Sequence, residues 1–136
     1  MSGVRILAQA HTVIFQHTLE NVLSGKKTQT RRVAKPTDDA VRDDNGSITA
    51  VLVNGRKKWQ VGKTYAVQPG RNLPSVARIE ITALEYEPIQ NVSHEDAIAE
   101  GYTSRVEFLQ AWQRIHGSSA ADANTWVVHF KVASTA

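Results

Sequence analysis

No cysteine occurs among the 136 residues of this chain. A disulfide framework, a thiolate metal site and a cysteine nucleophile are therefore excluded. The five histidines do not indicate a zinc site either, because none has the H-x-H or H-x-x-x-H spacing of zinc ligands. No apolar run is long enough to span a membrane or to form the core of a signal peptide. We expect a cytoplasmic protein that uses neither a metal nor a cofactor.

A P-loop is also missing, although the pair Gly25 and Lys26 invites that interpretation. The P-loop pattern requires a glycine five residues before this glycine, where the chain has Glu20. It also requires the loop to precede a helix, whereas here a helix-like segment comes first. The chain contains no internal repeat and no low-complexity block.

Negative charge is scarce in one part of the sequence. Between Lys26 and Arg71 there are eleven Lys and Arg against four Asp, a net charge of +7, while the rest has five against nine, a net charge of −4. Such asymmetry is typical of a chain that binds nucleic acid, a nucleotide or another phosphate-bearing partner. A run of charge is, however, about as often only a solvated surface.

The length and the hydrophobic content of 41% predict one globular domain with its own core. Hydrophobic periodicity and turn residues predict strands at 11–15 and 27–33, two runs flanking Asn54-Gly55, and further strands at 62–68, 75–89 and 125–133. Helices are expected at 16–25, 93–101 and 104–117, and residues 34–47 have the composition of a loop. Five or six strands that do not alternate with helices favour an α+β domain, a small mixed or antiparallel barrel with helices at its side.

Two predicted elements should supply much of the core. In the run 75–89, Ala77, Ile79, Ile81 and Ala83 share one face, which we expect to be buried. In the helix at 104–117, an apolar stripe is formed by Val106, Phe108, Leu109, Trp112 and Ile115.

The stretch LSGKKTQTRR, residues 23–32, is unusually polar for a segment that follows a helix. As a strand it would place Thr28, Thr30 and Arg32 on one face, and Lys27 and Arg31 on the other. Neither face is apolar enough for an ordinary core. The stretch is therefore either a solvated edge strand or a site for an anionic or polar ligand.

Glu100 stands in the last turn of its predicted helix, directly before Gly101. The helix macrodipole disfavours a negative charge there by roughly 0.3–1 kcal/mol. We expect a cation of the basic stretch to hold this carboxylate, and a raised pKa that would suit proton transfer. The alternative is a solvated glutamate that tolerates the small penalty.

The segments SGKKTQTRR, WQVGKTYAVQPG, EDAIAEGYTSRVEFLQAW and WVVHFKV resemble the ASCH family over residues 15–132. The most specific part is the G-x-K-T-x-T-x-R pattern of Gly25, Lys27, Thr28, Thr30 and Arg32, followed later by Glu100. The resemblance implies a single PUA-like domain over residues 1–136, a β-barrel of five to six strands with two to three flanking helices. Residues 34–58 would then be a basic insertion of a loop and a hairpin.

Some members of this family are amidohydrolases that deacetylate N4-acetylcytidine with a Lys, a Thr and a Glu. The resemblance places these roles on Lys27, Thr30 and Glu100. Thr30 would be the nucleophile, Lys27 the base, and Glu100 the acid or orienting group. Arg32 would bind the base carbonyl or the oxyanion. Lys27 and Thr30 are three residues apart, so in a regular strand their side chains would point to opposite faces. They share a site only if Lys27 lies in the turn after Gly25. Otherwise Thr28 is the alternative nucleophile.

The same resemblance leaves two other functions open, an RNA- or modified-base-binding module without catalysis and a ribonuclease. The partner would be a nucleoside or RNA, and no feature of the sequence fixes an oligomeric state. Trp59 or Tyr65 would stack on a base. Phosphate would be contacted by the cations Lys26, Lys27, Arg31, Arg32, Arg56, Lys57 and Lys58.

Overall fold

The computed structural model describes residues 12–15 and 18–135 of the chain. Within them, eight strands form one sheet: β1 (Thr12–Ile14), β2 (Gln29–Val33), β3 (Asp38–Arg42), β4 (Ile48–Val53), β5 (Arg56–Gln60), β6 (Thr64–Gln68), β7 (Ala77–Pro88) and β8 (Asn124–Thr135). The described helices are α2 (Leu19–Leu23), α3 (His94–Ala99) and α4 (Arg105–His116), with two short 3-10 turns, η1 (Ile89–Asn91) and η2 (Ser118–Ala120). The expected strand at 11–15 and helix at 16–25 begin outside the described residues.

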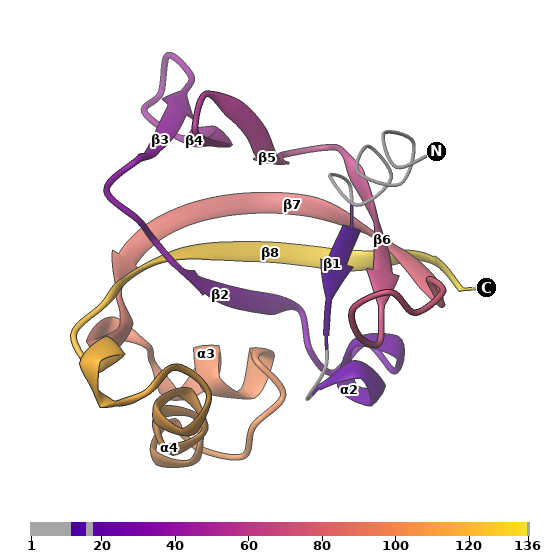
Figure 1. The fold of residues 1–136 in the computed structure, drawn as a ribbon, viewed down its shortest axis with the longest axis vertical. Helices are drawn as coiled ribbons and strands as arrows, with labels where there is room; N and C mark the ends of the chain where they lie inside the picture. Colours follow the sequence, from indigo (N-terminus) through magenta and orange to yellow (C-terminus); the bar gives the residue numbers. More distant parts are fainter. Residues whose placement is uncertain (1–11, 16–17, 136) are drawn as a thin grey trace.

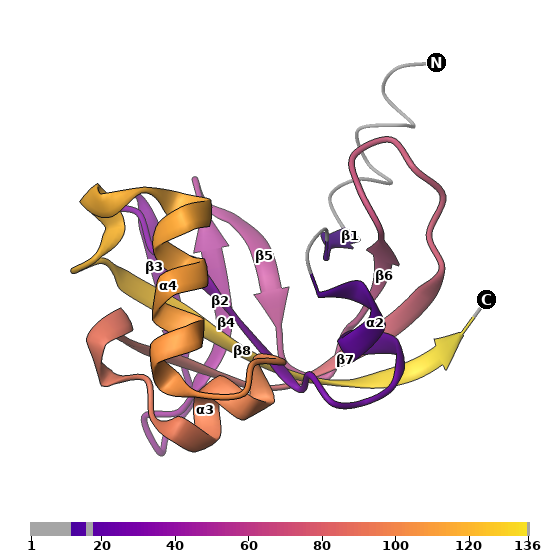
Figure 2. The same cartoon turned by 90° about the horizontal axis from the view of Figure 1, so that it is seen from below.

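Two long strands organise the sheet. β7 and β8 have 12 residues each and pair antiparallel along most of their length, and Figure 1 shows them as the curved central pair. β2 pairs with the first half of β8, β6 and β4 pair with β7, and β1 adds to β6 as a parallel strand. α3 and α4 lie together on one side of the β2–β8 part of the sheet, whereas α2 lies near β1 and β6 (Figure 2).

The expected α+β class is confirmed, but the expected barrel of five to six strands is not, because the described residues form eight strands in a sheet that does not close. In the described residues β2 pairs only with β8 and β5 only with β4, so the sheet keeps open edges. An additional strand, β3, lies in the segment expected to be a loop. β3 is an edge strand with mostly exposed residues, so its polar composition hides it, although it pairs antiparallel with β4 over its five residues, with a register shift between Val41 and Arg42. Within residues 12–15 and 18–135, three helices are present, in agreement with the expected two to three.

The hairpin at Asn54-Gly55 is confirmed, because β4 and β5 flank this pair and bond to one another antiparallel. The segment at 34–58 therefore contributes β3, β4 and part of β5 to the sheet.

The alternation expected along β7 holds only in its first half. Ala77, Ile79 and Ile81 are buried, but Ala83 is exposed and Leu84 is buried. The pairing of β7 with β8 shifts register between Ile81 and Ala83, and a bulge of this kind moves the following side chains to the opposite face.

The core has two clusters. The larger one is enclosed by the sheet and includes Phe15, Trp59 and Tyr65, and the smaller one joins α3 and α4 to the end of β7 through Ala97, Phe108 and Trp112. Of the stripe expected on α4, Val106 and Ile115 are exposed, because only the Phe108 and Trp112 face meets the rest of the molecule. None of the described helices has the length and hydropathy that crossing a membrane requires.

Candidate active site

Lys27 owes its position to the turn that follows α2. The helix ends at Ser24, and Gly25 has φ +81°, a left-handed conformation that favours glycine. The Lys27 backbone N–H then donates to the Asn21 carbonyl at 2.8 Å, so Lys27 still lies in the turn, two residues before β2 begins. This is the condition under which Lys27 and Thr30 can share a site.

Glu100 is the C-cap of α3 and only 2% exposed. Ser93 starts this helix with a capping box, and the Thr28 N–H donates to the Ala99 carbonyl at 2.7 Å, which fixes the end of α3 beside the start of β2. The Lys27 ammonium, itself 5% exposed, donates to Glu100 Oε1 and to the Glu100 carbonyl, both at 3.1 Å. The cation predicted to hold Glu100 is therefore Lys27.

Burial drives both members of this pair toward their neutral forms. Desolvation lowers the pKa of Lys27, against the attraction of Glu100. Desolvation likewise raises the pKa of Glu100, against the attraction of Lys27 and two arginines. Glu100 Oε2 accepts no hydrogen bond from any described residue, and Arg31 Nε lies 3.9 Å away. The two pKa values are thus shifted toward one another, which favours proton exchange within the pair and suits acid–base chemistry.

Arg31 is a buried structural cation rather than a surface contact. Its guanidinium lies 2.5 Å from Glu87 Oε1 and 3.2 Å from Asp96 Oδ2, with Glu100 beyond. Asp96 also accepts from Gln29 Nε2 at 3.2 Å, so one carboxylate caps α3 and ties it to β2. Arg31 Nη2 therefore serves internal carboxylates, whereas Nε and Nη1 have no hydrogen-bond partner among the described residues, and Arg31 lines the same pocket as Lys27.

Lys27, Thr30 and Glu100 line one pocket of about 250 Å³, which we call the small pocket. Thr30 lies on β2, opposite Val128 of β8, and is 5% exposed. Within the described part of the chain no hydrogen bond joins Lys27 to Thr30. Catalytic hydrogen bonds often shorten only when substrate binds.

Arg32 and Phe15 complete the wall next to Lys27. The Phe15 ring centroid lies 5.7 Å from Lys27 Nζ and 5.6 Å from Arg32 Cζ, so one aromatic ring supports two cations. The Arg32 Nη2 group donates to the Ile14 carbonyl at 3.2 Å, while its buried Nε has no partner among the described residues.

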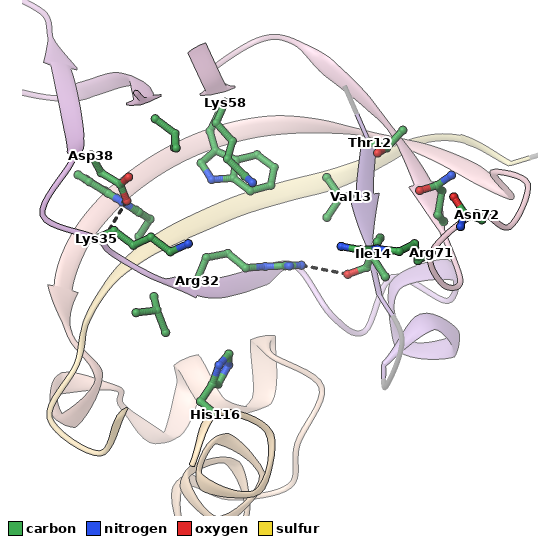
Figure 3. Close-up of a pocket in the computed structure, with 15 residues that line it drawn as sticks. Thr12, Val13, Ile14, Arg32, Lys35, Asp38, Lys58, Arg71, Asn72 and His116 are labelled. Atoms are coloured by element: carbon green, nitrogen blue, oxygen red, sulfur yellow. Dashed lines mark hydrogen bonds between the residues drawn. The ribbon is translucent and has the colours of Figure 1, made fainter. Parts of the chain in front are cut away.

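A second, larger pocket of about 780 Å³ adjoins the first, and we call it the large pocket (Figure 3). The two pockets share the lining residues Ile14, Arg32 and His116. The remaining charged side chains of the large pocket come from β3, β5 and two loops: Lys35, Asp38, Lys58 and Arg71.

Four predicted site residues do not line the small pocket. Lys26 and Thr28 are exposed and line neither pocket. Trp59 and Tyr65 are 3% and 4% exposed, with ring centroids 5.7 Å apart in the core, and this burial leaves no open ring face for stacking on a base. Trp59 contributes only to the wall of the large pocket.

The sequence interpretation missed several pocket residues. Phe15 and Tyr102 line the small pocket, and Lys35, Arg71 and His116 line the large one. Lys35 and Arg71 do belong to the basic half of the sequence, which was the available signal. No group of three or more His, Asp or Glu residues in the described ranges is placed to hold a metal ion.

Neither a family model nor a curated protein matches this sequence. Two solved structures share its fold. Protein EF3133 from Enterococcus faecalis V583, of family DUF984, has a TM-score of 0.62 and 19% identity over 85% of this chain, and this chain covers 66% of its length. The ASCH domain from Lactobacillus crispatus JV V101 has a TM-score of 0.61 and 20% identity, with 85% of this chain and 69% of that chain covered.

The hypothetical protein PH0355 is a more distant neighbour, with a TM-score of 0.50 and 11% identity over 88% of this chain and 94% of that chain. These similarities concern the fold, and activity has to be argued from the site itself.

Proposed function

From the premise that this chain has an ASCH-like fold, we propose that it is a small amidohydrolase acting on an N4-acylated cytidine-like nucleoside. The observation that carries this proposal is the buried Lys27–Glu100 pair, joined at 3.1 Å on the wall of a pocket that Thr30 also lines. A hydroxyl, a base and an acid around one pocket are the parts that acyl transfer needs.

The first step is attack of Thr30 Oγ on the acyl carbonyl carbon. Lys27 accepts the hydroxyl proton, which requires its neutral amine, and the lowered pKa of Lys27 supports this role. The carbonyl oxygen becomes an oxyanion, and the Arg32 guanidinium on the same pocket wall can stabilise it.

The C–N bond then breaks, and the leaving exocyclic amine takes a proton from Glu100. The raised pKa of Glu100 supports a protonated acid at this stage. The acyl group now forms an ester with Thr30. Transfer of a proton from Lys27 back to Glu100 restores the neutral pair, water attacks the ester with Lys27 as base, and the carboxylic acid leaves as Thr30 regains its proton.

A second candidate is binding of RNA or a modified base without turnover. It is favoured by the cations that line the large pocket. Ribonuclease activity would use the same cations to stabilise the charge that develops on a phosphate during strand cleavage.

The test is to incubate the chain with N4-acetylcytidine and with a short RNA, and to follow loss of the acyl group and strand cleavage. Lys27→Ala and Thr30→Val should each lower amide hydrolysis by about 10²–10⁴-fold, the range for loss of an acid–base or nucleophilic group. Thr28→Val is the matched control, because Thr28 is exposed and lines neither pocket. If neither substrate is converted while RNA binds with a steep salt dependence, the chain is a binding module.

A further inference from the structure

The large pocket collects cations that are not neutralised. Arg32 on β2, Lys35 in the following loop, Lys58 on β5 and Arg71 after β6 line it, against the single carboxylate of Asp38. No ion pair in the described residues includes any of these four cations. Figure 3 shows Lys35 and Lys58 pointing toward the space beside Arg32, with His116 facing them from the end of α4.

Asp38 is held as part of the wall rather than as a partner for these cations. Its Oδ2 accepts from Trp126 Nε1 and from the Lys35 backbone N–H, both at 2.9 Å. Desolvation, followed by the charges of Arg32 and Lys35, lowers the pKa of Lys58, and Asp38 offsets this only in part. Like charges gathered from four separate segments of the chain raise the local concentration of anions.

The volumes of the two pockets also favour a ligand that extends from the small pocket into the large one. Sites for small molecules usually enclose about 300–1,000 Å³. The small pocket, at about 250 Å³, falls below this range, whereas the large pocket, at about 780 Å³, falls within it. A ligand that places its reacting end beside Lys27 and Thr30 would continue past Arg32, which lines both pockets, into the large one.

We propose that the large pocket binds a phosphate group of the substrate through Lys35 and Lys58, so that the ligand is a phosphate ester of a nucleoside rather than a free nucleoside. The orientation rests on the proposed function, which places the base in the small pocket. Arg32 then lies between base and phosphate, because it lines both pockets. Charge-assisted hydrogen bonds from lysine ammonium groups are the interactions that such a ligand would gain.

The test compares the affinity of the intact chain for cytidine, cytidine 5′-monophosphate, cytidine 3′-monophosphate and a cytidine trinucleotide by calorimetry. A phosphate in the correct position should strengthen binding by about tenfold or more. The double variant Lys35→Gln/Lys58→Gln should abolish this gain. Lys63→Gln is the matched control, because Lys63 is an exposed lysine in the turn before β6 and lines neither pocket.

The probes also separate the sources of the phosphate. A gain with a monophosphate alone indicates a free nucleotide, and a gain that needs the trinucleotide indicates an RNA backbone; either supports a phosphate site. Equal affinity for cytidine and all three phosphate esters overturns it, as does an equal loss in Lys63→Gln, which would mean that diffuse surface charge causes the gain.

Failure of the hydrolase proposal is distinguishable from failure of this one. If N4-acetylcytidine is not hydrolysed but the phosphate gain depends on Lys35 and Lys58, the phosphate site stands alone. If N4-acetylcytidine is hydrolysed and its 5′-phosphate changes neither affinity nor kcat/KM, the phosphate site is wrong and the hydrolase stands.

Discussion

Lys27→Met tests whether the pair with Glu100 behaves as a buried pair. The substitution keeps an unbranched side chain but removes the ammonium, so both Glu100 oxygens that Lys27 contacts at 3.1 Å lose their donor. At a pH where Glu100 is ionised, removing its cationic partner costs about 3–5 kcal/mol, because the carboxylate stays buried without compensation. That is a large part of the roughly 5–15 kcal/mol by which domains are stable.

The loss of stability in Lys27→Met should increase as the pH rises. Without Lys27 the folded-state pKa of Glu100 rises further above its ordinary value of 4.5. The folded state then binds more protons than the unfolded state above that value, so the free energy of unfolding falls as pH rises, by up to about 1.4 kcal/mol per pH unit. The variant should therefore be less destabilised at about pH 5 than at about pH 8.

Guanidinium unfolding followed by tryptophan fluorescence measures this at both pH values. Lys57→Met, an exposed lysine on β5, should change the free energy of unfolding by less than about 0.5 kcal/mol. The double variant Lys27→Met/Glu100→Gln should recover most of the loss, since no charge is left buried. A loss below about 1 kcal/mol in Lys27→Met that is the same at both pH values would refute the reasoning.

Two further predictions concern the same site. Gly101→Ala should destabilise the fold by about 1–3 kcal/mol, because Gly101 has φ +96° and a new Cβ would lie 2.8 Å from Asn21 Nδ2. Gly46→Ala is the control, because Gly46 has a similar φ of +82° but open space around the new Cβ, and it should cost less in the same unfolding assay. Equal losses in the two variants would mean that the Asn21 contact is unimportant. A plot of kcat/KM against pH should be bell-shaped with both limbs between the ordinary values of 4.5 and 10.5, since the pKa of Lys27 is lowered and that of Glu100 is raised. Glu100→Gln should remove the alkaline limb, and its persistence would assign that limb to another group.

The parts of the site that sequence could predict depend on local chemistry. Gly25 ends α2 and turns the chain, and a carboxylate at a helix C-terminus requires a cation, so the turn and a basic partner for Glu100 could be predicted without a structure. The motif resemblance added Lys27 and Thr30, which line the same pocket as Glu100.

The parts that sequence could not predict depend on long-range packing. An arginine in a polar stretch normally indicates surface, yet Arg31 is buried because Glu87, Asp96 and Glu100 converge on it from elements 56 to 69 residues away. The edge strand β3 and the open sheet follow from strand pairing, and the burial of Trp59 follows from the hairpin packing onto the core. None of these has a local signature.

The central claim is that Thr30 is a nucleophile served by the Lys27–Glu100 pair. Rapid acid quenching of the chain with N4-acetylcytidine, followed by intact-mass and peptide analysis, tests it most directly. We predict transient addition of one acetyl group on the peptide that contains Thr30, and its loss in Thr30→Val together with turnover. Undiminished hydrolysis by Thr30→Val, or an acetyl group carried by another residue, would contradict the account.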